Sequence, residues 1–332
     1  MTRAGLFARL AVAALAIAAA CSAHAEECRP DTLASFDMGF LAVFVPVTID
    51  GQNYAFMVDT GGSLSTLAPA VASTLNLAPA TIARGEETFM TDGTMLDRFV
   101  TVGALQIGAA KIAGVRFMLQ PQQSRAGIAH FAGTVAPDFL RNFDLDFDFG
   151  RNTMSLLSRE HCPDRAASWT DTAIAVPFQT DAAHHIVVPV KLDGVQTTAA
   201  IDTGSSTTVM SALLAERDFH LAPGKGLQQR PGATARSLVR YQHAFQTLKL
   251  NGVEIERITI GILPDEMATT AVAHHQFKLA ERRPTGPVMN AVPLIIGLDQ
   301  LRKFHLYVDY RNEMLYVAAA NAAYETSPPE QP

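Results

Sequence analysis

The sequence contains two Asp-Thr-Gly tripeptides, at residues 59–61 and 202–204, and these are its strongest candidates for chemistry. Two carboxyl groups held a few ångströms apart do not both ionise, so they share one proton over a useful range of pH. The ionised group can take a proton from water while the protonated group donates one to a carbonyl oxygen. Such a pair can hydrolyse an amide without a metal or a covalent intermediate. We therefore predict that Asp59 and Asp202 act together on one water molecule.

The residues next to both acids are suited to holding them in place. Thr60 and Thr203 carry hydroxyl groups that can hydrogen-bond between the two copies and fix the separation of the acids. Gly61 and Gly204 allow a sharp backbone turn that brings N–H groups close to the carboxylates. The predicted supporting residues are Thr60, Gly61, Ser63, Thr203, Gly204 and Ser205.

The tripeptides belong to a longer internal duplication, in which four blocks recur in the same order. The first two pairs of blocks are each offset by 143 residues (189 − 46 and 202 − 59). The matching blocks are residues 45–51 and 188–194, 57–63 and 200–206, 76–79 and 220–223, and 138–154 and 299–314. This duplication predicts two similar lobes related by a pseudo-two-fold axis, each of which supplies one acid.

Each half is expected to be mostly β-structure. Residues 41–49 and 186–192 are apolar and β-branched, and each run leads into an Asp-Gly pair typical of a hairpin turn. Residues 67–77 and 208–220 are predicted as short helices, and residues 143–157 and 304–317 as strands. The expected organisation is a signal peptide at 1–25, a first lobe at 26–158, a linker at 159–172, a second lobe at 173–318 and a flexible tail at 319–332.

The residues around both acids resemble the active-site loops of the pepsin and retropepsin clan of aspartic proteases. These are Val58–Ser63 and Ile201–Ser206, and Leu294–Gly297 resembles the clan's apolar-apolar-Gly element behind the loop. The export-tagged, two-repeat form over residues 41–318 is similar to bacterial retropepsin-like aspartyl proteases. The resemblance implies an all-β, bilobal pepsin-like fold with two β-barrel-like lobes, short helices and an active-site cleft between them.

The same resemblance implies endopeptidase activity on extended peptide or protein substrates bound in the cleft. Asp59 and Asp202 are then the catalytic dyad, and no cofactor is implied. Two departures keep another hypothesis open: Ala136 stands where a Gly is expected behind the first loop, and Gly62 stands where the second half has Ser205. The alternative is a catalytically silent, inhibitor-like protein of the bacterial envelope that binds peptides or proteins in the same cleft.

The flap over the cleft and the pH dependence can also be predicted. No Tyr occurs in residues 80–100, so Phe89 and Met90 are the flap candidates. Because Ser205 offers Asp202 a nearby hydroxyl donor, Asp59 has fewer donors and is expected to be the protonated member. A shared proton predicts a bell-shaped rate profile with an acidic to mildly acidic optimum.

The composition excludes several other classes of protein. The chain has 332 residues, of which 48% are hydrophobic, and a net charge of −6, so it can form a core. No cluster of Lys or Arg is present, which excludes nucleic acid as the partner. The histidine pairs at 184–185 and 274–275 lack ligand-spaced partners, so we predict no metal site and place these histidines on the surface. Asp144, Asp146 and Asp148 alternate and are expected on a solvent-facing strand.

The N-terminal residues predict export. A positive start, an apolar run at 10–20 and small residues at 23 and 25 are typical of a signal peptide, so we expect a periplasmic or secreted protein. The alternative is a lipoprotein anchored through Cys21. Cys28 and Cys162 are predicted to form a disulfide in an oxidising compartment, with two free thiols as the alternative. No later segment is long enough to span a membrane, and a monomer is expected because each lobe supplies one acid.

The second half is longer than the first between its acid and its closing block. The separation is 97 residues from Asp202 to Asp299 but 79 from Asp59 to Asp138, a difference of 18. We hypothesise that residues 264–293 border the cleft and shape substrate choice, with a solvated surface loop as the alternative.

Overall fold

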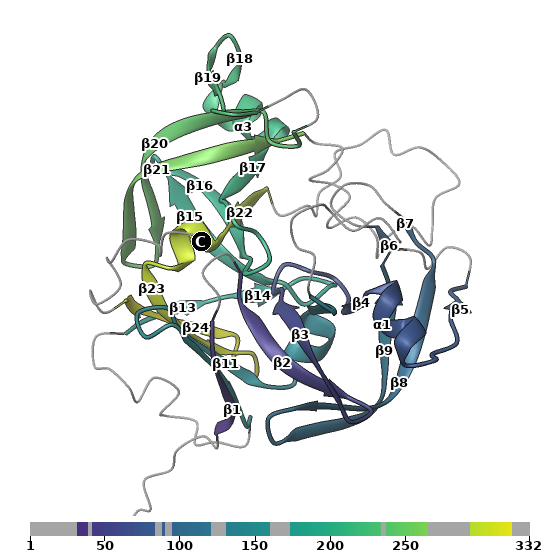
Figure 1. Cartoon of the computed structure of the whole chain (residues 1–332). Helices are drawn as coiled ribbons and strands as arrows, with labels where there is room; N and C mark the ends of the chain where they lie inside the picture. Colours follow the sequence, from purple (N-terminus) through teal and green to yellow (C-terminus); the bar gives the residue numbers. More distant parts are fainter. Residues whose placement is uncertain are drawn as a thin grey trace, which may run out of the picture.

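The computed structural model describes residues 32–38, 42–83, 88–89, 95–120, 131–159, 173–233, 237–264 and 293–320. Within these residues the chain forms two β-barrels that are joined by a six-stranded sheet (Figure 1). The fold is therefore all-β and bilobal, as the duplication predicts.

The first barrel is a sheet that closes on itself because β2 also pairs with β8. In sheet order its strands are β2 (Phe44–Ile49), β3 (Gln52–Val58), β10 (Gly133–Val135), β4 (Thr66–Leu67), β9 (Ala110–Leu119) and β8 (Arg98–Ile107). The elements added to it are the edge strand β5 (Ala80–Thr81), the two-stranded sheet of β6 (Thr88–Phe89) and β7 (Met95–Leu96), and the helices α1 (Pro69–Thr74) and α2 (Pro137–Leu140).

The second barrel closes in the same way through the pairing of β15 with β20. In sheet order its strands are β15 (Ile186–Leu192), β16 (Val195–Ile201), β22 (Leu294–Ile296), β17 (Val209–Ser211), β21 (Val253–Leu263) and β20 (Tyr241–Leu250). The elements added to it are β14 (Gln179–Thr180), β18 (Ala222–Pro223), β19 (Gly226–Gln229), α3 (Ala212–Phe219) and α5 (Leu298–Leu301).

The two barrels have matching strand directions, which confirms that the sequence repeat is a structural repeat. β10 runs parallel to β3 and antiparallel to β4, and β22 has the same relation to β16 and β17. The predicted Asp-Gly turns are also present: Asp50 and Gly51 have φ values of +47° and +86°, and Asp193 and Gly194 have +44° and +87°. Positive φ at both positions matches the right-handed twist of a hairpin.

The helices α1 and α3 are shorter than the sequence predicts. The first residues of both predicted segments instead form the strands β4 and β17, which pair with two neighbours each inside their barrels. In these strands the backbone N–H and C=O groups are satisfied by distant segments of the chain, and a local helical pattern in the sequence does not reveal such pairing. α3 begins only after Ser211, whose hydroxyl accepts the N–H of Leu214 at 3.1 Å as an N-cap.

A third sheet joins the lobes in the order β1 (Thr32–Asp37), β12 (Thr153–Leu157), β11 (Asp144–Asp148), β23 (Phe304–Asp309), β24 (Met314–Ala319) and β13 (Ile174–Pro177). The expectation that β11 turns its acids to solvent is wrong. Asp144 and Asp148 are buried because β11 lies centrally, beside β23 of the other half. Tyr307 donates its hydroxyl to Asp144 at 3.0 Å, and His305 binds Asp146.

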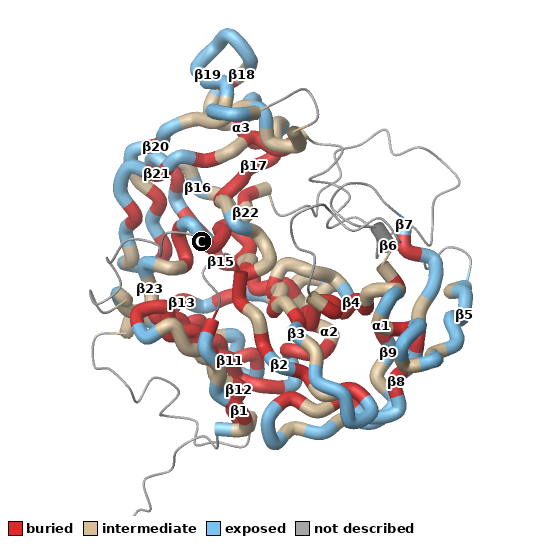
Figure 2. The backbone as a smooth tube through the Cα atoms, in the orientation of Figure 1, coloured by how far each residue is buried: buried red, intermediate tan, exposed pale blue. Residues whose placement is uncertain are grey.

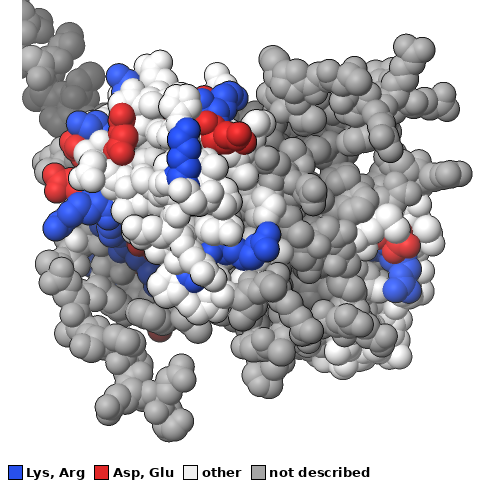
Figure 3. Space-filling view, turned by 90° about the horizontal axis from the view of Figure 1, so that it is seen from above, with Lys and Arg blue, Asp and Glu red and all other residues white. Residues whose placement is uncertain are grey.

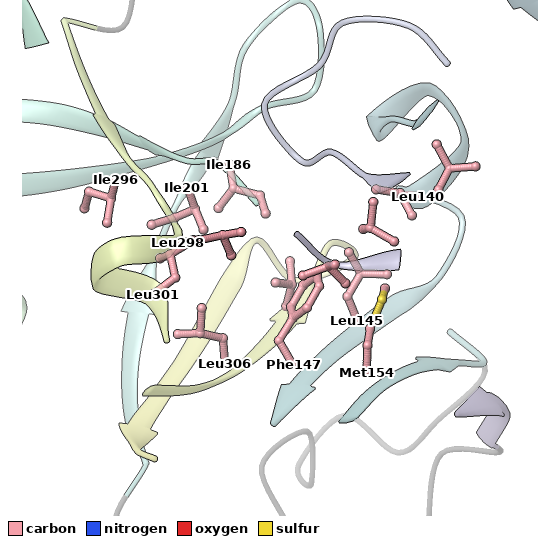
Figure 4. Packing of buried hydrophobic residues seen from close by; sticks show 14 of the residues in the cluster. Leu140, Leu145, Phe147, Met154, Ile186, Ile201, Ile296, Leu298, Leu301 and Leu306 are labelled. Atoms are coloured by element: carbon pink, nitrogen blue, oxygen red, sulfur yellow. The ribbon is translucent and has the colours of Figure 1, made fainter. Parts of the chain in front are cut away.

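One hydrophobic core extends through both lobes. Buried and more exposed residues alternate along strands such as β15 (Figure 2). Successive side chains of a strand point to opposite faces, so apolar residues at every second position predict such strands. Figure 4 shows the part of the core that connects the lobes, and its labelled side chains are Leu140, Leu145, Phe147, Met154, Ile186, Ile201, Ile296, Leu298, Leu301 and Leu306. The loops that carry the two acids follow strands anchored in this core.

Candidate active site

Both acids lie immediately after the second hairpin strand of their barrel. Asp59 follows β3 and Asp202 follows β16. The backbone N–H of Asp59 donates to the carbonyl of Val135 and that of Asp202 to the carbonyl of Ile296, both at 3.0 Å. The two loops therefore start from the same position in their barrels, and both carboxyl groups are half-buried.

The two threonines lock the loops to each other. The hydroxyl of Thr60 donates to the carbonyl of Ile201 at 2.7 Å and accepts the N–H of Thr203 at 3.0 Å. Reciprocally, the hydroxyl of Thr203 donates to the carbonyl of Val58 at 2.8 Å and accepts the N–H of Thr60 at 3.1 Å. Both threonines are fully buried. The predicted hydrogen bonding between the two copies is therefore present, and it fixes one lobe against the other.

The two glycines bring each loop against the acid of the opposite lobe. A methyl group at Gly61 would overlap the carboxyl group of Asp202, and a methyl group at Gly204 would overlap that of Asp59. The two carboxyl groups meet across the pseudo-two-fold axis, where each affects the pKa of the other. Any residue larger than glycine would force the acids apart.

Backbone N–H groups stabilise the negative charge on each acid. Gly61 donates to Oδ1 of Asp59 at 3.2 Å, whereas Gly204 and Ser205 donate to Oδ1 of Asp202 at 2.8 and 3.1 Å. The expectation that the Ser205 hydroxyl donates to Asp202 is wrong, because this hydroxyl donates instead to the carbonyl of Thr207 at 2.8 Å. Ser205 supports the acid through its backbone.

Burial raises the pKa of both acids. The pKa of Asp59 is raised to about 7, chiefly by burial and next by the charge of Asp202, against smaller lowering effects of His185 and backbone N–H groups. Burial also raises the pKa of Asp202, but the N–H groups of Gly204 and Ser205, the charge of His185 and the hydrogen bond from Asp59 all lower it. Both acids therefore hold a proton more tightly than an ordinary carboxyl group, and the assignment of the shared proton to Asp59 stays a prediction.

A second pair of acids stabilises the two loops through hydrogen bonds on the side away from the catalytic carboxyl groups. The sequence did not mark these acids as functional. The carboxylate of Asp138 accepts the N–H of Ser65 at 3.0 Å and its hydroxyl at 2.7 Å. The carboxylate of Asp299 accepts the N–H of Thr208 at 2.8 Å and its hydroxyl at 2.7 Å. Asp138 and Asp299 open the closing blocks of the duplication, so their equivalence was the signal that could have revealed them.

Ala136 and Gly297 occupy equivalent positions behind the loops. The N–H of Ala136 donates to the Ser65 hydroxyl at 3.0 Å, and that of Gly297 donates to the Thr208 hydroxyl at 3.1 Å. The side chain of Ala136 therefore leaves the hydrogen bonding behind the first loop equivalent to that behind the second.

Gly62 lies between Asp59 and Ala136. A methyl group at Gly62 would lie 3.3 Å from the Cβ of Ala136 and 2.9 Å from Oδ2 of Asp59. In the second lobe, a methyl group at Gly297 would instead lie 2.6 Å from the backbone of Thr207. Gly62 is therefore confined mainly by the carboxylate of Asp59, whereas Gly297 is confined by the backbone of its own loop.

The placement of His185 on the surface is wrong. Its side chain is only 3% exposed, and its Nδ1 lies 2.8 Å from Oδ2 of Asp181. Its charge acts on both Asp59 and Asp202. His184 is partly exposed, with Nε2 2.8 Å from Nη1 of Arg141. Adjacent histidines in a turn can point to different environments, and no local pattern distinguishes them.

The remaining predicted residues are placed only in part. Ser63 lies half-buried on the first loop, and Phe89 lies in β6 opposite Met95 of β7. Met90, Cys28 and Cys162 lie outside the described residues, as do residues 265–292. The flap, the disulfide and the role of the longer segment therefore stay predictions. Among the described residues, no group of three or more His, Cys, Asp or Glu is arranged to hold a metal ion.

Comparison with known proteins supports the interpretation of the motifs. The family model described as aspartyl protease matches the chain in two regions, residues 45–128 and 188–286. Each region contains one Asp-Thr-Gly loop, and together they cover more than half of the chain. A search of curated proteins finds no match. In the described part of the chain, no helix is long and apolar enough to cross a membrane.

Proposed function

The chain belongs to the aspartyl protease family, and from that premise we propose that it is an endopeptidase in which Asp59 and Asp202 activate one water molecule. The observation that carries the proposal is the cross-lobe contact of the two carboxyl groups, each against the glycine of the opposite loop. A shared proton between them provides one base and one acid in the same site.

The mechanism assigns different roles to the two acids. Asp202, ionised, takes a proton from water while the water oxygen attacks the peptide carbonyl carbon. Asp59 gives its proton to the carbonyl oxygen, which forms a tetrahedral intermediate. On collapse, the proton on Asp202 passes to the leaving nitrogen and a hydroxyl proton returns to Asp59. An acid and an amine are released, and the pair regains its starting protonation.

The rigidity of the site favours catalysis. The buried Thr60 and Thr203 hydrogen bonds fix the distance between the lobes, so the acids need little rearrangement when substrate binds. The catalytically silent alternative rested on Ala136 and Gly62, but the hydrogen bonding behind the first loop is equivalent to that behind the second, which supports the enzyme.

The proposed substrate is an extended peptide or unfolded protein bound between the lobes. We propose that β6 and β7 belong to the flap and that residues 264–293 border the cleft. One chain supplies both acids, so a monomer is sufficient for catalysis. On the face in Figure 3, Lys and Arg are interspersed with Asp and Glu over the described surface, and no broad field of one sign attracts nucleic acid.

Export is proposed from residues that lie outside the described part of the chain. The signal peptide at 1–25 directs the protein to the periplasm or the exterior, with the lipoprotein anchored at Cys21 as the alternative. A disulfide between Cys28 and Cys162 fits such a compartment.

The proposal is tested by incubating the purified protein with an unfolded protein and a random peptide library between pH 3 and 8. We expect internal cleavage with a bell-shaped dependence on pH and inhibition by a statine-type transition-state mimic. Activity that rises monotonically into alkaline pH would contradict the mechanism. An inert protein that still binds the mimic would favour the silent binder.

A further inference from the structure

His185 directly precedes β15, whose pairing with β16 leads toward the catalytic acid of the second lobe. β15 and β16 pair with Val187 opposite Ala200 and Val188 opposite Ala199. Continued by two residues, this register places His185 opposite Asp202. The adjacent residues Ile186, which follows His185, and Ile201, which precedes Asp202, both belong to the core shown in Figure 4. Residues directly opposite in an antiparallel pair have their side chains on one face, with Cβ atoms about 5 Å apart.

The turn before β15 holds His185 in this position. Oδ1 of Asp181 accepts the N–H of Ala183 at 2.9 Å and that of His185 at 3.0 Å, and its Oδ2 binds Nδ1 of His185 at 2.8 Å. His184 adopts the left-handed conformation, with φ at +64°, which allows the tight turn. Both the position and the charge of the imidazole are therefore set by one carboxylate.

The other ring nitrogen of His185 is unusual. Nε2 is buried and has no hydrogen-bond partner among the described residues. A buried polar nitrogen without a partner is costly, so a histidine here needs a compensating role. The structural function of capping the turn is already fulfilled by Asp181, which binds the other side of the ring.

The first lobe has no equivalent of this pair. With the offset of 143 residues, Ala42 corresponds to His185 (185 − 143) and Met38 to Asp181 (181 − 143). Both residues are buried and apolar. The two lobes therefore differ in one respect that the duplication itself does not explain: a histidine precedes β15 in the second, and a buried alanine stands at the matching position in the first.

We propose that Asp181 and His185 form a positioning pair that assigns the roles of the two catalytic acids. The imidazolium of His185 keeps Asp202 ionised as the general base and leaves the shared proton on Asp59. This inference rests on the proposed function and adds to it a reason why two equivalent loops act differently.

The charged groups around His185 favour its cationic form. Burial opposes the imidazolium, but the hydrogen bond and charge of Asp181, followed by the charges of Asp202 and Asp59, raise the pKa of His185 overall. Burial likewise opposes the carboxylate of Asp181, yet His185 lowers its pKa overall. Arg141, at the end of α2, contacts the neighbouring His184 rather than His185.

Removal of the positive charge has a measurable consequence. In His185→Gln the side chain stays polar and of similar size but is neutral, so Asp202 should hold its proton more tightly. We expect the acid limb of the kcat/KM profile to move upward by about one pH unit, a tenfold change in the ionisation constant. His185→Lys restores a positive charge and should return the limb toward that of the parent. The matched control is His184→Asn, because asparagine tolerates the left-handed backbone at this position, and this variant should leave the acid limb unchanged.

The decisive measurement is an NMR titration of ¹³C-labelled aspartate carboxyls and of the His185 ring in the full-length protein. The parent is expected to show a cationic His185 wherever it cleaves peptide, and Asp202 is expected to titrate about one pH unit higher in His185→Gln. A neutral His185 at the pH of maximal activity, or an unmoved Asp202, would overturn the proposal. The titration needs no turnover, so it can fail or succeed independently of peptidase activity. The ring titration of the parent decides the question even if the Gln variant does not fold.

Discussion

The cross-lobe threonine network gives the sharpest test of how the active site is held together. Thr60→Val keeps the shape of the side chain but removes its hydroxyl. The carbonyl of Ile201 and the N–H of Thr203 then lose their partners, at 2.7 and 3.0 Å, in a fully buried position. A buried polar group left unsatisfied costs about 1–3 kcal/mol. Two such groups predict a loss of about 3 kcal/mol or more in the free energy of unfolding.

The matched control is Thr60→Ser, which keeps the hydroxyl and loses only a methyl group. Removal of one buried methyl group is expected to cost about 1 kcal/mol. The assay is urea unfolding followed by circular dichroism, with the free energy compared at a common urea concentration to limit extrapolation. The pseudo-two-fold symmetry predicts the same order for Thr203→Val and Thr203→Ser. A valine variant as stable as the serine variant would refute the view that these hydrogen bonds join the lobes.

Three further predictions concern the acids and the glycines around them. Gly61→Ala should abolish peptidase activity while the protein stays folded by circular dichroism, because its methyl group overlaps the carboxyl of Asp202; full activity would contradict the close approach. Gly62→Ser should lower kcat at least tenfold, and adding Ala136→Gly should recover part of the loss, as measured by a double-mutant cycle. Asp59→Asn should raise the free energy of unfolding at pH 8 by up to about 4 kcal/mol but not at pH 3.5, as measured by urea unfolding. The sign follows because burial raises the pKa of Asp59 from 3.8 to about 7, so stability from its bound proton is present at low pH and lost as the pH rises through 7.

The dyad and the architecture were predictable because their signals are repeated. A single Asp-Thr-Gly fits any turn, but two copies at the same place in a duplicated chain require equivalent positions in space. The Asp-Gly turns at residues 50–51 and 193–194 were predictable because their conformations depend on local chemistry.

The features that could not be predicted depend on contacts between distant segments. Asp144 is buried because β11 pairs with β23 of the other half, and no local pattern encodes that register. Ser205 follows Asp202 closely enough in sequence for its hydroxyl to be a candidate donor to that acid, but the hydroxyl donates to the carbonyl of Thr207. Gly62 and Ala136 look like two separate departures in the sequence, and only the structure shows that they lie close together behind Asp59.

His185 is the most instructive of the missed residues. Its type is common on surfaces, and its partner Asp181 is four residues earlier, a spacing that has no special meaning outside a helix. The signal existed only in the comparison of the halves, where a buried Ala42 stands at the matching position. A difference between two copies of a duplication can therefore identify function as well as the similarity does.

The central claim is that Asp59 and Asp202 act as one catalytic unit. It is tested most directly by measuring cleavage of an unfolded protein by the parent, Asp59→Asn and Asp202→Asn at the optimal pH, with folding of each variant checked by circular dichroism. The account predicts that the parent cleaves internal peptide bonds and that each variant is folded and at least a thousandfold slower. Comparable cleavage by either folded variant would contradict it, because a single carboxyl group cannot supply both the base and the acid.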